Sequence, residues 1–217
     1  MTLALMTALK QRGLRVKGMK PVATGCVRSP SGLRNPDAEL IRACCGKEMA
    51  YEQINPYAFE PPIAPLFAAR AHRVQIDKAV INKAFGALSA LSDTVLVEGV
   101  GGWRVKLGED LQMSDLVRSM QLQVILVVGL RLGCINHALL SAAAVREDGL
   151  PLAGWIANQV DPEYDCIDET VQLLSEELPA PMIGSAPFSI EFDSNATAGH
   201  FSAAALEVLA GKGVPFR

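Results

Sequence analysis

Short runs of apolar residues alternate along the chain with longer segments in which apolar residues recur every three or four positions. The short runs predict buried β-strands, and the longer segments predict amphipathic helices. The expected strands span residues 14–23, 94–98, 123–129, 152–160 and 182–186. The expected helices span residues 1–12, 64–73, 76–91, 135–146, 165–178 and 198–209, and one more begins at Pro36.

This alternation of strands and helices is typical of right-handed βαβ crossovers. We therefore expect an α/β fold, a three-layer sandwich around a mostly parallel sheet. The 217 residues are enough for one compact domain. The sequence contains no internal repeat, low-complexity tract or linker, so we expect a single domain over residues 1–217.

The segment VLVEGVGGW, residues 95–103, ends an apolar strand in a carboxylate followed by three glycines. In α/β proteins, ligands bind at the carboxyl ends of the parallel strands. Glu98 could hold a hard divalent cation there, while Gly99 and Gly101 would let the main chain approach a phosphate or substrate. A plain glycine turn beside a solvated glutamate is the alternative interpretation.

Three more polar residues fall at strand ends or helix starts. Lys20 could hold a phosphate or carboxylate, and Thr24 could bond an amine. Asp37 lies in the first turn of the helix that begins at Pro36, where the helix dipole favours a carboxylate. A surface lysine and a structural aspartate are the alternatives. Asp37 and Glu98 together would supply the two carboxylates that Mg²⁺ needs when phosphates and waters complete its octahedral shell.

Two later strand ends also suggest ligand contacts. Gly133 leads the chain from one strand into a helix whose first amides could bind an anion, although an ordinary capped loop has the same pattern. Asn158 ends another strand with an amide that could hydrogen-bond to the edge of an adenine, although an asparagine at such a position is more often a turn residue.

Composition narrows the class of ligand. The net charge is −3 and the basic residues are scattered, which argues against nucleic acid. No apolar run is long enough to cross a bilayer and no signal segment is recognisable, so we expect a cytoplasmic protein that does not bind membranes. Five cysteines without a CxxC pair predict reduced thiols. The three histidines form no metal-binding motif. Small-molecule chemistry is therefore favoured.

Seven segments, taken in order and with their spacing, resemble the dethiobiotin synthetase family: KPVATG, GLRNPDA, NPYAFEPPIAP, VEGVGGW, VVGLRLGCINHA, AGWIANQV and PAPMIGSAPF. The resemblance implies a P-loop NTPase-like fold and a homodimer with a shared active site. It also implies that ATP and Mg²⁺ are used to close the ureido ring of dethiobiotin from 7,8-diaminononanoate and CO₂, a step of biotin biosynthesis.

The resemblance further implies roles for residues of the first half of the chain. Lys20 would stabilise the charge of a carbamate and of the transferred phosphoryl group, and Thr24 would orient the diamine. Asp37 and Glu98 would ligate Mg²⁺ beside the nucleotide, with Gly99 and Gly101 in the nucleotide-binding loop.

For the second half, it implies contacts to both substrates. The helix start made of Gly133, Cys134, Ile135 and Asn136 would receive the substrate carboxylate in the partner subunit's site. Asn158 would recognise adenine, with Pro187 close to the base and Glu191 near the ribose.

One departure from the family pattern is large. Family members begin with a strand and a G-x-x-x-x-G-K-[ST] phosphate loop ahead of the first helix, whereas this sequence opens within that helix and contains no such motif. The loop would cradle the phosphates and supply a lysine for the transferred phosphoryl group. We therefore expect the first strand and the P-loop to be missing, and this chain to be impaired as an enzyme.

Two alternatives share the expected fold. A noncatalytic dimer or regulatory switch would carry a membrane-targeting tail or a signature lysine, and the residues after Leu209 read only AGKGVPFR. A cobyrinic-acid-type, amide-forming synthase usually continues into a glutaminase domain, which this sequence does not contain.

Overall fold

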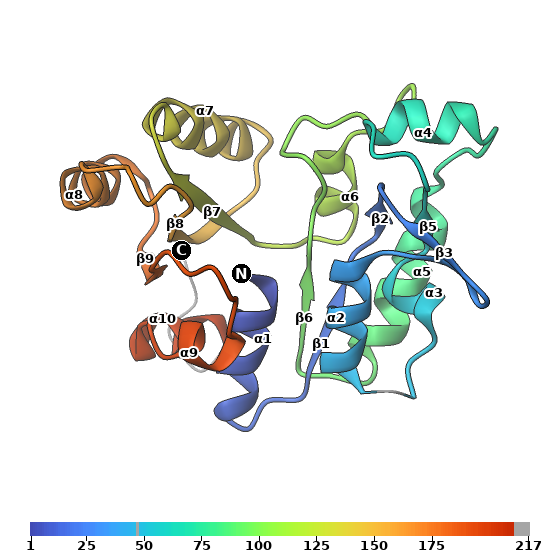
Figure 1. Cartoon of the computed structure of the whole chain (residues 1–217), viewed down its shortest axis with the longest axis horizontal. Coiled ribbons are helices and arrows are strands. Elements are labelled where there is room, and N and C mark those ends of the chain that lie inside the picture. Colours follow the sequence, from blue (N-terminus) through green and yellow to red (C-terminus); the bar gives the residue numbers. More distant parts are fainter. Residues whose placement is uncertain (47, 211–217) are drawn as a thin grey trace. The chain divides into compact units, whose positions relative to one another are not determined.

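The computed structural model describes residues 1–46 and 48–210, which fall into two compact units (Figure 1). The first unit comprises Arg12–Gln121, and the second comprises Leu3–Gln11 together with the chain from residue 122 onward. Each unit contains parallel strands and helices. The α/β class with parallel strands is therefore confirmed, and the single domain over residues 1–217 stays a prediction.

The first unit is organised around two pairs of parallel strands. β1 (Val16–Met19) pairs with β6 (Thr94–Val97), and β2 (Val22–Ala23) pairs with β5 (Tyr57–Ala58). An antiparallel hairpin joins β3 (Val27–Ser29) to β4 (Gly32–Arg34). The helices are α2 (Pro36–Cys45), α3 (Tyr51–Ile54), α4 (Pro65–Ala71), α5 (Lys78–Ser89) and α6 (Met113–Ser119). Apolar side chains from both strands and helices fill the core, among them Met19, Ile41, Ile54, Ile81 and Leu88.

The second unit has one parallel sheet of three strands in the order β7 (Val124–Leu130), β8 (Leu152–Gln159), β9 (Met182–Ala186). Two crossover helices connect them, α7 (Cys134–Glu147) and α8 (Ile167–Glu177), while α1 (Thr2–Gln11), α9 (Ser194–Ala198) and α10 (Ala203–Leu209) complete the unit. Trp155 of β8 is fully buried in a cluster that includes Leu130, Cys134 and Leu174. This is the expected βαβ pattern.

Local signals account for several element ends. Gly13 follows α1 with a φ of 83°, a conformation that glycine adopts without strain, so it ends the helix as expected. Asn35 caps α2 by accepting a hydrogen bond from the amide of Ala38, and Asp37 lies in the first turn. The predicted helix end at Gly13 and the predicted helix start at Pro36, with Asp37 in its first turn, are confirmed, whereas the cap by Asn35 was not predicted.

Two predicted elements are wrong as single elements. The strand over residues 14–23 is divided into β1 and β2, because the Lys20 amide donates to the carbonyl of Ile54 and Pro21 has no amide to donate. The helix over residues 198–209 is instead α9 and α10. The chain turns between them, where the amide of Ser202 donates to Ile183 of β9 and its hydroxyl caps α10.

Five short elements were not predicted: β3 and β4 of the hairpin, α3, α6 and β5, the last lying inside the proline-rich segment 55–65. They are two to seven residues long, too short for a periodic pattern to show. All five cysteines are free thiols, as predicted.

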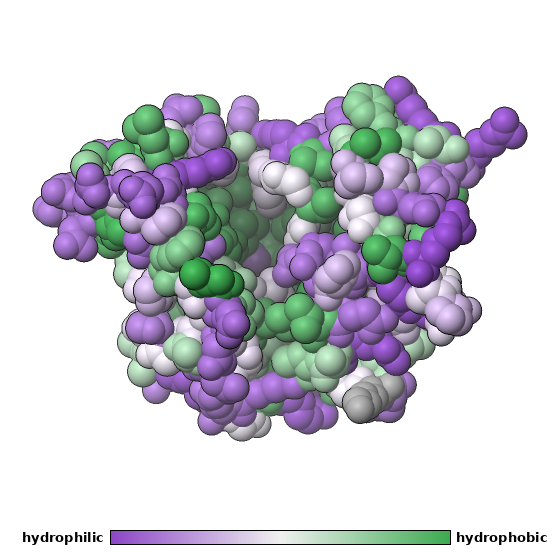
Figure 2. Space-filling view, in the orientation of Figure 1, coloured by the Kyte–Doolittle hydropathy of each residue, from purple (hydrophilic) through white to green (hydrophobic). Residues whose placement is uncertain are grey.

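Within residues 1–46 and 48–210, every helix is too short or too polar to span a lipid bilayer. Polar and apolar residues are interspersed over the visible surface of each unit, in keeping with the scattered charges (Figure 2). The AGKGVPFR tail lies, apart from Ala210, outside the described residues.

Candidate active site

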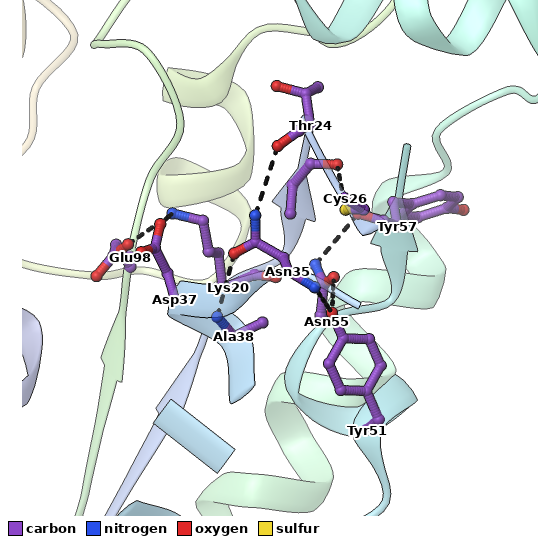
Figure 3. Close-up of polar contacts among 11 residues, drawn as sticks. Lys20, Thr24, Cys26, Asn35, Asp37, Ala38, Tyr51, Asn55, Tyr57 and Glu98 are labelled. Carbon is purple, nitrogen blue, oxygen red and sulfur yellow. Dashed lines mark hydrogen bonds and ion pairs between the residues drawn. The ribbon is translucent and has the colours of Figure 1, made fainter. Parts of the chain in front are cut away.

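Three charged side chains of the first unit meet at one point. The ammonium of Lys20 lies 2.6 Å from Glu98 Oε1 and 3.0 Å from Asp37 Oδ2 (Figure 3). The lysine side chain is only 9% exposed, whereas those of Glu98 and Asp37 are 28% and 57% exposed. A buried cation therefore holds two carboxylates that reach solvent.

The parallel register of β1 and β6 explains why Lys20 and Glu98 are neighbours. Met19 pairs with Val97, and the Glu98 amide donates to the Met19 carbonyl at 2.7 Å. The next residue of each strand therefore leaves the sheet at the same edge, the carboxyl end at which α/β proteins bind ligands. Asp37 approaches the same point from the first turn of α2.

Two opposing effects act on the Lys20 ammonium. Burial lowers its pKa, since a desolvated cation is unfavourable, but the hydrogen bonds and charges of Glu98 and then Asp37 outweigh burial. The net result is a pKa above the ordinary lysine value of 10.5. Lys20 is consequently a permanent cation at neutral pH.

The two carboxylates suit a hard divalent cation. Within the described residues, Asp37 Oδ1 and Glu98 Oε2 have no hydrogen-bond partner, so each group can offer an oxygen while the other contacts Lys20. No group of three or more acidic, cysteine or histidine side chains that could hold a metal occurs in residues 1–46 and 48–210. A metal here would take its remaining ligands from water and phosphate, which is how Mg²⁺ is usually bound beside nucleotides.

Thr24 follows β2 and is partly exposed, and its side chain does not join the charged group (Figure 3). The connection runs through its backbone, whose carbonyl accepts a hydrogen bond of 3.4 Å from the Asn35 side chain. Asn35 also caps the helix that carries Asp37. Thr24 is therefore connected to the helix that carries Asp37 through the Asn35 side chain.

Of the predicted loop glycines, Gly101 shows a conformational requirement. Its φ is +74°, and a Cβ there would lie 2.7 Å from Val105 Cγ2. Gly99 is exposed, and a Cβ on it would make only ordinary contact with Met113 at 3.7 Å. The turn after Glu98 therefore depends on glycine at Gly101.

The second unit holds the remaining predicted residues. Gly133, with a φ of +89°, lies at the start of α7, and Cys134 is buried beneath it, whereas Ile135 is half-buried and Asn136 exposed. The Cys134 amide already donates to the Arg131 carbonyl at 3.0 Å, so an anion at this helix start would have to use the amides of the neighbouring residues.

Asn158 lies near the end of β8 in register with Ala186, the last residue of β9, so Pro187 is the first residue after the neighbouring strand. Pro187 and Glu191 are exposed. The Gln159 side chain, which was not predicted as part of the site, accepts a hydrogen bond of 3.2 Å from the Phe188 amide and holds this loop to β8.

Asn35 and Asn55 were also not predicted, although both are buried polar residues beside the Lys20 group. Each precedes a proline, and these two Asn-Pro pairs are the signal in the sequence that could have identified them. A buried asparagine needs hydrogen-bond partners, so it organises the backbone around it.

Comparison with known proteins identifies the family. A family model described as an AAA domain matches residues 1–196. The ATP-dependent dethiobiotin synthetase of Xanthomonas oryzae pv. oryzae (strain PXO99A) is 47% identical over 195 residues, which cover 90% of this chain and 87% of the relative. The enzyme of that name from Pseudomonas aeruginosa (strain UCBPP-PA14) is 49% identical over 197 residues, covering 90% and 86%. This chain belongs to the dethiobiotin synthetase family.

Solved structures agree with the fold expected for the dethiobiotin synthetase family. The MinC:MinD cell division protein complex of Aquifex aeolicus contains a chain that is similar over all of this chain and 91% of its own length, with a TM-score of 0.57 and 16% identity. MinD from the same organism gives a TM-score of 0.54 at 14% identity, over all of this chain and 92% of its own. These likenesses show a P-loop NTPase-like α/β fold, which confirms the fold predicted from the resemblance.

Proposed function

We propose that the chain closes the ureido ring of dethiobiotin from 7,8-diaminononanoate and CO₂, with ATP as co-substrate and Mg²⁺ as cofactor. The observation that carries this proposal is the convergence of Asp37 and Glu98 on the buried Lys20, in a chain close to half identical to ATP-dependent dethiobiotin synthetases.

The reaction needs two successive anions to be stabilised. One amine of the diamine adds to CO₂ and loses a proton, which gives a carbamate. A carbamate oxygen then attacks the terminal phosphorus of ATP, so that a mixed carbamic–phosphoric anhydride forms and ADP leaves. The second amine attacks the carbamate carbon, the ring closes, and phosphate departs with the bonding electrons.

Lys20 is suited to both anions because it is a cation at every pH near neutrality and is fixed by two carboxylates. Charge positioned before the reaction lowers the barrier most where solvent is excluded. The 9% exposure of its side chain meets that condition. Thr24 would accept or donate a hydrogen bond to an amine of the diamine from the loop after β2.

Asp37 and Glu98 would hold Mg²⁺, which, when bound, would offset charge on the phosphates of the nucleotide. Both carboxylates are more exposed than Lys20, so a metal can reach them from solvent. Gly99 and Gly101 would line the adjacent nucleotide loop.

In the second unit, Asn158 would recognise adenine through its amide, with Pro187 against the base and Glu191 near the ribose. The amides at the start of α7, from Gly133 to Asn136, would bind the substrate carboxylate in the partner's site, so that the working form is a homodimer. The five free thiols support a reducing compartment, and we place the enzyme in the cytoplasm.

Among the functions considered for this fold, a regulatory switch and a cobyrinic-acid-type synthase are less well supported. The relatives that are 47–49% identical to this chain are named dethiobiotin synthetases, and the matched segments cover 86–87% of their length. The likeness to MinD, by contrast, rests on 14–16% identity.

The test is an assay of the purified chain with 7,8-diaminononanoate, bicarbonate, ATP and Mg²⁺, in which dethiobiotin is measured by mass spectrometry. Slow, ATP-dependent product formation is expected, because the sequence lacks a G-x-x-x-x-G-K-[ST] loop. A second form, extended ahead of Met1 by a strand and such a loop, is expected to be much faster. If this folded, extended form makes no dethiobiotin, the proposal is wrong.

A further inference from the structure

A buried chain of hydrogen bonds lies beside the group formed by Lys20, Asp37 and Glu98 (Figure 3). Its members are Asn55, Tyr51 and Asn35, which come from the end of α3, the start of α3 and the cap of α2. They are 2%, 5% and 6% exposed. Water therefore cannot replace the bonds that these side chains make with one another.

Asn55 is fully bonded. Its side-chain amide donates to the Lys20 carbonyl at 2.6 Å and to the Tyr57 carbonyl at 3.1 Å, and its Oδ1 accepts from the Tyr51 hydroxyl at 2.9 Å. The Lys20 amide is bound as well, to the Ile54 carbonyl at 2.8 Å. Both backbone groups of Lys20 are thus fixed by the segment at the end of α3, at the point where the chain leaves β1.

Tyr51 links Asn55 to Asn35, the cap residue of α2. Its hydroxyl accepts a hydrogen bond of 2.8 Å from the Asn35 amide, and the Arg34 guanidinium lies 4.1 Å from the centre of its ring. Arg34 is itself paired with Glu39 of α2 at 3.2 Å. The tyrosine is therefore held at its hydroxyl and on its ring face.

The Asn35 side chain makes the remaining two hydrogen bonds, one to the first turn of α2 and one to Thr24. Its Oδ1 accepts from the Ala38 amide at 3.2 Å and so caps the helix whose first turn carries Asp37. Its Nδ2 donates to the Thr24 carbonyl at 3.4 Å. One chain of hydrogen bonds, joined at the Asn35 backbone amide, therefore runs through these three residues and reaches the backbone at Lys20, at Thr24 and at the first turn of α2, which carries Asp37.

We propose that Asn55, Tyr51 and Asn35 are positioning residues, which fix Lys20, Thr24 and Asp37 relative to one another for phosphoryl transfer to the carbamate. This inference rests on the proposed function. None of the three touches the reacting groups. Their role is to hold β1, β2 and α2 in register, because these elements bring the three site residues together from separate parts of the chain.

Two facts separate this role from ordinary core packing. The described residues contain five buried polar or charged side chains outside the aromatic class, and three of them are Lys20, Asn35 and Asn55. Moreover, every polar side-chain atom of Asn55 is used, and its strongest contact, at 2.6 Å, is to the backbone of the site lysine. An apolar core would fill this space without defining where Lys20 lies.

The test is Tyr51→Phe, which removes one hydroxyl and keeps the ring beneath Arg34. The Asn35 amide and Asn55 Oδ1 then lose their common partner, so the site elements can shift. Displacement of a site by about 1 Å can cost about a hundredfold in rate. We expect kcat to fall about tenfold to a hundredfold, with a smaller change in KM for ATP because the proposed adenine contact, Asn158, lies in the other unit.

The matched control is Tyr164→Phe, which removes a partly buried hydroxyl bonded to Thr170 Oγ1 at 2.7 Å in the second unit. It should lower stability without lowering kcat. If both variants lose the same fraction of activity at equal loss of stability, Tyr51 is only structural and the proposal is wrong.

A readout independent of turnover comes from ¹⁵N NMR of the lysine ammonium groups, with the Lys20 signal assigned from its loss in Lys20→Met. Burial and two carboxylates should make its protons exchange slowly with water. Exchange about tenfold faster or more is expected in Tyr51→Phe and wild-type exchange in Tyr164→Phe. If Lys20 exchange is unchanged in Tyr51→Phe, the positioning role is rejected. If the signal responds but no form makes dethiobiotin, the ring-closing function fails instead.

Discussion

Glu98→Gln separates the charge of Glu98 from its shape. Glutamine has nearly the same size and still offers an Oε1 to the Lys20 ammonium, which lies 2.6 Å from Glu98 Oε1 in the wild-type protein. The substitution removes the negative charge and with it one of the two proposed metal-binding carboxylates. Asp37 remains on the same ammonium at 3.0 Å, so Lys20 keeps one ionic partner.

The expected loss of stability is small. In the variant the amide oxygen still accepts a hydrogen bond from the charged Lys20 ammonium, so only the ion pair is lost, and an ion pair near the surface stabilises a protein by about 0.2–1 kcal/mol. The Glu98 side chain is 28% exposed, so solvent screens part of this interaction. We expect a decrease of about 1 kcal/mol in the free energy of unfolding, which corresponds to about 2–4 °C in Tm for a chain of this size.

The expected loss of activity is much larger. Removing one preorganised electrostatic contact from a transition state lowers kcat by about 10²–10³. The loss should be accompanied by a higher Mg²⁺ concentration for half-maximal rate, because a neutral amide is a weaker ligand than a carboxylate for a hard cation. Activity would therefore fall far more than the change in stability can explain.

The measurement combines dethiobiotin formation, titrated with Mg²⁺, and urea unfolding of the same preparation. Glu109→Gln, the same change at a glutamate paired with Arg70 at 2.7 Å, controls for the loss of an ion-paired carboxylate elsewhere in the unit. A Glu98→Gln enzyme with the wild-type rate and Mg²⁺ dependence would refute the metal assignment. A loss of several kcal/mol in stability would instead show that Glu98 acts mainly on folding.

Three further predictions concern other parts of the molecule. Because the folded-state pKa of Lys20 is raised, its stabilisation is complete below the ordinary value of 10.5 and is lost only as pH rises through the higher folded value. The difference in urea stability between wild type and Lys20→Met should therefore be constant between about pH 7 and about pH 10 and shrink in stronger alkali; a difference that already shrinks near neutral pH would contradict this. Gly101→Ala should lower the free energy of unfolding, measured in urea, by about 1–3 kcal/mol because the φ of Gly101 is positive. Gly99→Ala should change it by no more than about 0.5 kcal/mol. Equal effects of the two substitutions would disprove the requirement for glycine at Gly101. Asn158→Ala should raise KM for ATP about tenfold or less and leave KM for the diamine unchanged, since it removes uncharged hydrogen bonds; an unaltered KM for ATP would remove Asn158 from the nucleotide site.

The elements that were predicted correctly are those whose signals are local. β7, β8 and β9 are apolar runs with glycine or proline near their ends, and α7 has a regular apolar face. By contrast, β2, β5 and α3 are two to four residues long and exist because tertiary hydrogen bonds fix them. The break at Lys20 has the same origin, since the Ile54 carbonyl that takes its amide is 34 positions away along the chain.

The sequence by itself determined the α/β class, the family and the residue types at each strand end, because periodicity and motifs are properties of neighbouring residues. Only the tertiary structure decided that the Lys20 ammonium lies between Asp37 and Glu98, the latter 78 positions away, and that Asn55, Tyr51 and Asn35 connect the segments that carry the site. Strand register and helix packing set these distances. Register and packing both depend on which segments, far apart in the sequence, bury their apolar side chains against each other, and the pattern of neighbouring residues does not contain that information.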